Sequence, residues 1–194
     1  MIVNWSLIIV LFCLSIPGVY LVMTRLIFFL LPNNTPTLKK RFSRFAVGQT
    51  LLMVLVMSFA GTVLSVRIGL HASLLAGILP GESEFNSFIA ILLPIFLYTL
   101  LGLVIFIALY YGMVSSILDE HSMRVLNNLR LALGVDGSAL YGVAEEIIAR
   151  WGLMNFFVFF AITVTGAATP VTIFVALMVS AILFAIGQIP AYIA

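Results

Sequence analysis

Charged residues and cysteine are both scarce in this 194-residue chain. Only 8% of the residues are Asp, Glu, Lys or Arg, and 63% are hydrophobic, whereas a soluble domain has about 25% charged and about 45–50% apolar residues. So few charges cannot cover a water-soluble surface, which excludes a cytosolic enzyme, a disordered tail and a nucleic-acid binder with a basic patch. The single cysteine, Cys13, excludes a disulfide framework. The composition predicts a polytopic membrane protein whose partner is the lipid bilayer, with no nucleic-acid partner.

Five apolar stretches are long enough to cross the hydrocarbon core, which takes about 20 helical residues. They are residues 2–23 (2–31 if extended), 45–66, 87–114, 141–164 and 170–188. A further segment has one apolar and one polar helical face, and we expect it either in the membrane interface or packed on the bundle as a connector. That segment is 117–133. The predicted fold is therefore all-α, a transmembrane helix bundle with about five spans and one interfacial amphipathic helix, in a single membrane-embedded domain over 1–194.

Basic residues are concentrated between the first two spans. Lys39, Lys40, Arg41 and Arg44 are four of the nine Lys and Arg residues in the chain. Because short cytoplasmic loops carry an excess of Lys and Arg, we expect this loop to be cytoplasmic and the N-terminus to lie outside. The same alternation returns the segment before the fourth span to the cytoplasm.

The fourth span carries three charged residues, Glu145, Glu146 and Arg150. A charge at the bilayer centre costs at least ~2.5–3.5 kcal/mol, so such a cluster is a candidate functional site. Glu146 and Arg150 are i,i+4 neighbours and can pair, either to support chemistry or only to fix helix packing. Glu145 points about 100° away from Glu146, along a stripe of small residues that lets another helix approach. This stripe contains Gly142, Ala149 and Gly152. We expect Glu145 to face the bundle and to be the candidate general base.

Residues 145–150 form an EExxxR run at the start of a membrane helix. This run resembles motif 1 of the CAAX protease and bacteriocin-processing (CPBP) family of intramembrane endopeptidases. The second motif of that family, FxxxH, ends the next helix and is typically followed by a Leu/Ile-Pro pair; here Phe184 begins the sequence FAIGQIP, with Gln188 where the family has His. Both motifs fall within a motif core, 141–190. The family's third motif, a His followed four residues later by Asn, lies on a later helix that we expect this chain to lack.

The resemblance assigns a role to each motif residue. It implies that Glu145 activates the attacking water, that Glu146 and Arg150 support it, and that Gln188 replaces the motif 2 His, with Phe184 as a packing and substrate-binding residue. It also implies hydrolysis of peptides or prenylated protein C-termini, at the cytoplasmic side of a prokaryotic plasma membrane.

A metal is implied only by analogy with family members that are described as metal-dependent. Gln188 cannot titrate near neutral pH and is a poor metal ligand. The two histidines, His71 and His121, lie in the predicted outer loop and in the amphipathic helix. No cofactor is therefore evident from the sequence.

Two other functions fit the same residues. One is a non-catalytic membrane scaffold with the family's fold, which Gln188 and the missing third motif favour. The other is a transporter that uses Glu145 as an ion or proton site, because a carboxylate beside small residues in a bundle also suits that role.

Overall fold

Helices make up nearly all of the protein in this computed structural model. It describes residues 3–70, 85–167 and 169–193, except for the side chains of 85–91, 114–115 and 188–193. The structure is 91% helical, with no strand among the described residues. Five helical stretches are long and apolar enough to cross a membrane: Trp5–Leu30, Pro36–Ile68, Leu92–Met113, Glu120–Thr165 and Pro170–Gly187. The all-α bundle is confirmed, and the chain is an integral membrane protein.

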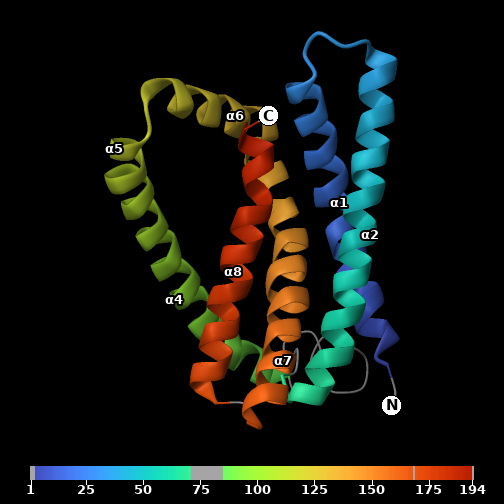
Figure 1. The fold of residues 1–194 in the computed structure, drawn as a ribbon, viewed down its shortest axis with the longest axis vertical. Helices are drawn as coiled ribbons and strands as arrows, with labels where there is room; N and C mark the ends of the chain where they lie inside the picture. The colour runs from blue at the N-terminus through green and yellow to red at the C-terminus, as the bar shows by residue number, and fades with distance from the viewer. Residues whose placement is uncertain (1–2, 71–84, 168, 194) are drawn as a thin grey trace. The chain divides into compact units, whose positions relative to one another are not determined.

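The first two helices pack against each other as an antiparallel pair (Figure 1). Helix α1 spans Trp5–Leu30, and Asn4 caps it by accepting a hydrogen bond from the Leu7 amide. Helix α2 spans Pro36–Ile68. It therefore begins nine residues before the predicted span at 45, so the basic residues lie on helix and not in the loop where we expected them. Pro36 in the first helical turn, followed by Lys and Arg, which are good helix formers, explains the earlier start.

The third span is one long helix that is followed by two short helical segments. Helix α4 (Phe85–Leu109) continues through a short π-helical segment, η1 (Tyr110–Val114), into one turn of helix, α5 (Ser115–Ile117). Asp119 then caps the next helix, and the hydrogen bond from Ser122 lowers the pKa of the Asp119 carboxyl.

The fourth span is a composite of three segments. Helix α6 (Glu120–Glu146) has a break at Gly134, whose φ of 74° suits glycine. The predicted amphipathic helix is the portion of α6 before this break. The chain continues as a π-helix, η2 (Ile147–Met154), and then as α7 (Asn155–Thr165). Helix α8 (Pro170–Ile193) returns along η2 and α7.

Two compact units divide the chain. One comprises Met1–His71 and Ala132–Ala194, and the other comprises Ala72–Leu131. The predicted single domain over 1–194 stays a prediction. The first unit holds the motif core, and its interior includes three valines with no exposed surface: Val19, Val54 and Val158.

Candidate functional site

The charged run lies where the fourth span changes from α-helix to π-helix. Glu145 and Glu146 end α6, and Arg150 lies in the middle of η2. A π-helix bonds each amide to the carbonyl five residues back, and π-helical segments frequently occur at functional sites. The spacing of the run predicted its residues to be neighbours on a helix, but gave no indication of this change in helix type.

Glu146 and Arg150 form an ion pair on the outside of the helix. The distance from Arg150 Nε to Glu146 Oε2 is 3.9 Å, and the two side chains are 48% and 68% exposed. The expected i,i+4 pairing is confirmed. Because both side chains are open and the distance is long for an ion pair, the pair contributes little to stability by itself.

Glu145 is more sheltered than Glu146. Its side chain is half-buried, next to the fully buried Ala144 and to Ile147, which is 3% exposed. Tyr141, also half-buried, lies one turn before it on α6. The two adjacent carboxyl groups thus have different surroundings, which suits separate roles, but the catalytic role of Glu145 stays a prediction.

Two glycines bring η2 close to α2. A side-chain carbon on Gly152 would lie 2.7 Å from Met57 Cβ, and one on Gly61 would collide with the Trp151 carbonyl and indole. Of the stripe predicted to receive another helix, Gly152 is in contact and Ala149 is buried, whereas Gly142 has no atom within 4 Å of such a carbon. Only the later part of the stripe therefore packs against a neighbour.

Polar side chains also join α2 to the fourth span. The Trp151 indole Nε1 donates to Thr62 Oγ1 over 3.2 Å, and Asn155 Nδ2 donates to the Trp151 carbonyl over 2.7 Å. Thr62 and Asn155 are 1% exposed. We did not predict these contacts from the sequence, although a lone Asn in the apolar run after residue 151 was an available indication. They hold η2 at a fixed register on α2.

Arg25 anchors the first helix to α6 at the break around Gly134. Its guanidinium donates to both carboxylate oxygens of Asp136, over 2.8 and 2.9 Å, and also to the Leu133 carbonyl. The Leu133 carbonyl immediately precedes the break at Gly134. The only sequence indication was the charge of Arg25 itself, since an Arg inside an extended span needs a partner.

The second motif lies on α8. Phe184 is half-buried, and Gln188 lies on the same helix with its side chain outside the described residues. Helix α8 packs along η2. Within the first unit, α8 and α7 run antiparallel to each other (Figure 1). The two predicted motifs therefore lie on neighbouring helical segments of this unit, one at the junction of α6 with η2 and the other on the last turns of α8.

The residues present do not suit a metal. Within the described part of the chain, no group of three or more His, Cys, Asp and Glu side chains comes together. His121 lies exposed at the start of α6, and His71 lies outside the described residues. Two adjacent glutamates and a glutamine at 188 make a weak donor set for a metal ion.

No protein-family model, no curated protein and no solved structure matches this chain. The resemblance to the CPBP endopeptidases thus depends on the two motifs alone.

Proposed function

We propose that the protein is an intramembrane endopeptidase of the CPBP type, with Glu145 as general base. The observation that carries this proposal is the half-buried Glu145 at the junction of α6 and η2, beside the exposed Glu146–Arg150 pair. Helix α8, whose last turns bear the motif 2 sequence, packs along η2 and so supports the proposal.

In this mechanism, the Glu145 carboxylate takes a proton from water as the water oxygen bonds to the peptide carbonyl carbon. The carbon–nitrogen bond then breaks, and the proton passes from Glu145 to the leaving amine. Glu146 and Arg150 are the supporting partners of Glu145, and the Gln188 amide is the group that would donate a hydrogen bond to the carbonyl oxygen.

The proposal includes a location and a substrate class. The basic start of α2 favours an orientation with that end in the cytoplasm and the N-terminus outside, in the plasma membrane of a prokaryote. In this orientation, peptides or prenylated protein C-termini would reach Glu145 from the cytoplasmic side.

Hydrolysis of peptides by the purified protein in liposomes tests the proposal. Glu145→Gln should lower the rate at least about 100-fold, the range expected for loss of a general base. Glu120→Gln is the control for the change of charge, because it also converts a glutamate of α6 to an amide, but at an exposed, Arg124-paired position on the first turn of the helix. Equal rates for wild-type and Glu145→Gln would refute the assignment.

A non-catalytic scaffold of the same fold is the second candidate. Gln188 favours it, because glutamine cannot exchange protons as histidine does, and so does the close packing of η2 on α2 through Gly61 and Gly152. A scaffold predicts no hydrolysis by the wild-type or by Gln188→His. Glu145-dependent ion flux into the same liposomes would instead support the transporter hypothesis.

A further inference from the structure

The first turns of α2 carry exposed cations, of which Arg41 and Arg44 project away from α1. Ser43 faces α1, since its hydroxyl donates to Thr24 Oγ1 over 3.0 Å. At 100° per residue, Arg41 lies about 160° from Ser43 and Arg44 about 100°. We call Lys40, Arg41 and Arg44, all exposed, the basic face.

Among the described residues, no acidic side chain forms an ion pair with a cation of the basic face. The ion pairs among the described residues involve Arg25, Arg124 and Arg150, and none includes a cation of the basic face. The fourth cation nearby, Lys39, is held differently: its ammonium donates to the Pro32 carbonyl over 2.9 Å and lies 5.7 Å from the Phe28 ring centroid. Three positive charges are therefore left to bind an external anion.

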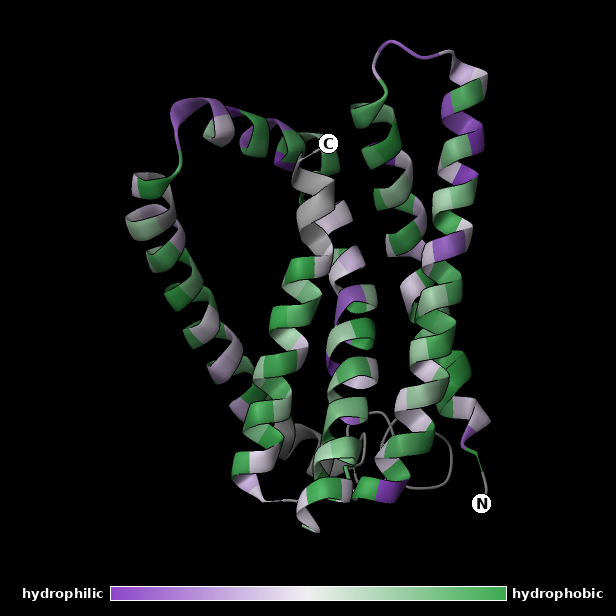
Figure 2. Cartoon of the chain, viewed as in Figure 1, coloured by the Kyte–Doolittle hydropathy of each residue, from purple (hydrophilic) through white to green (hydrophobic). Residues whose placement is uncertain are grey.

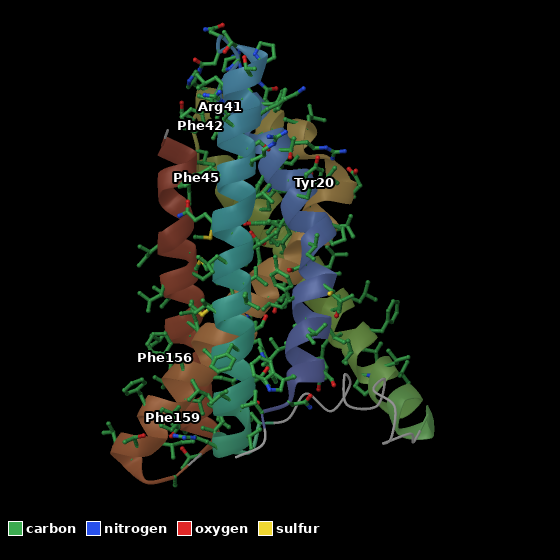
Figure 3. The ribbon with its side chains drawn as sticks, turned by 90° about the vertical axis from the view of Figure 1, so that its right-hand side faces the viewer. Tyr20, Arg41, Phe42, Phe45, Phe156 and Phe159 are labelled. Atoms are coloured by element: carbon green, nitrogen blue, oxygen red, sulfur yellow. The ribbon has the colours of Figure 1, made fainter. Side chains whose placement is uncertain are left out.

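Exposed apolar side chains adjoin these cations on the membrane side. Phe42 and Phe45 are 48% and 71% exposed, next to Arg41 on the early turns of α2 (Figure 3). One turn beyond Arg44 lies Gly48, with no atom within 4 Å of the position of a side-chain carbon, and then Leu52, which is 62% exposed. The hydropathy colours change accordingly, from purple bands at the start of α2 to green along its length (Figure 2).

We propose that the basic face binds an anionic glycerophospholipid. The planar guanidinium groups of Arg41 and Arg44 match a phosphate in geometry and charge. Phe45, the space at Gly48 and Leu52 would receive the glycerol and acyl chains. Basic clusters at the end of a membrane span attract anionic lipids, and the apolar strip distinguishes this surface from a site for a soluble anion. The proposal does not depend on peptidase activity.

Native mass spectrometry of the delipidated protein tests the proposal. We would titrate it with phosphatidylglycerol and with phosphatidylcholine of the same acyl chains. Wild-type should prefer phosphatidylglycerol, and Arg41→Gln/Arg44→Gln should lower that preference roughly 25-fold, at about fivefold for each cation near the membrane surface. Each single substitution should lower it about fivefold, so the proposal remains testable if the double variant does not fold.

Arg67→Gln is the matched control, because Arg67 is exposed on the last turn of the same helix. It should keep the wild-type preference. The proposal fails if the basic-face variants keep that preference, or if Arg67→Gln lowers it equally. It also fails if soluble glycerol 3-phosphate displaces the lipid at equal concentration, because the acyl chains would then contribute nothing.

Discussion

The two faces of the helical stretch 145–155 differ in what they contact. On one face, Ala149, Gly152 and Asn155 are buried, and Gly152 packs on Met57 of α2. On the other face, Glu146 and Arg150 are exposed and joined only by a 3.9 Å ion pair. The first, which we call the packed face, fixes the position of the segment in the bundle. The second, which we call the charged face, leaves Glu146 and Arg150 exposed.

This difference separates stability from chemistry. Substitutions on the packed face should destabilise the fold, because small residues there have no room to grow. Substitutions on the charged face should leave the fold nearly unchanged and affect activity. Glu145 continues the stripe of Ala149 and Gly152 on the packed face but is only half-buried, so it combines a packed position with partial exposure.

The largest effect on stability is expected at the close contact of α2 with η2. Gly61→Ala should lower the free energy of unfolding by about 1–3 kcal/mol, because the added methyl group meets the Trp151 backbone and indole. Gly48→Ala on the same helix has open space and should be neutral or stabilising by up to ~1 kcal/mol. Unfolding in mixed micelles with increasing SDS measures both. Equal losses would mean that the packed face does not depend on these glycines.

The next largest loss of stability is expected when the contact between Arg25 of α1 and Asp136 of α6 is broken. Asp136→Asn removes the charge from a bidentate pair whose Arg25 also binds the Leu133 carbonyl. We expect a clear drop in the thermal unfolding midpoint. Glu120→Gln breaks a more exposed, single-contact pair with Arg124 and should lower the midpoint less. The reverse order would contradict the anchoring role of Arg25.

The indole hydrogen bond on the packed face should have a smaller effect. A double-mutant cycle of Trp151→Phe and Thr62→Val isolates the 3.2 Å bond between these side chains. The expected coupling energy is about 0.6 kcal/mol, the average for hydrogen bonds between membrane helices. A coupling near zero would indicate that steric packing alone sets the register.

The charged face should show the smallest effect on stability. A cycle of Glu146→Gln and Arg150→Gln should give a coupling of at most ~0.5 kcal/mol, because both side chains are exposed. A coupling above 1 kcal/mol would show that the pair is structural. In that case the two faces would not differ in the way proposed.

Hydropathy alone predicted the class of fold and the five spans, because long apolar runs have few alternatives in a membrane. It did not predict the start of α2, because Lys39 to Arg44 read equally well as a loop. The i,i+4 spacing predicted the Glu146–Arg150 pair. No local pattern indicated the π-helix η2 or the pairing of Arg25 with Asp136, since these depend on contacts between segments distant in the sequence.

Peptide hydrolysis by Gln188→His, with and without Glu145→Gln, shows whether Glu145 is the general base. If Glu145 activates the attacking water, Gln188→His should hydrolyse peptides at least as fast as wild-type, and adding Glu145→Gln should lower that rate at least about 100-fold. Glu120→Gln in the same background should change nothing. Hydrolysis that persists in the Gln188→His/Glu145→Gln double variant would show that Glu145 does not activate the attacking water.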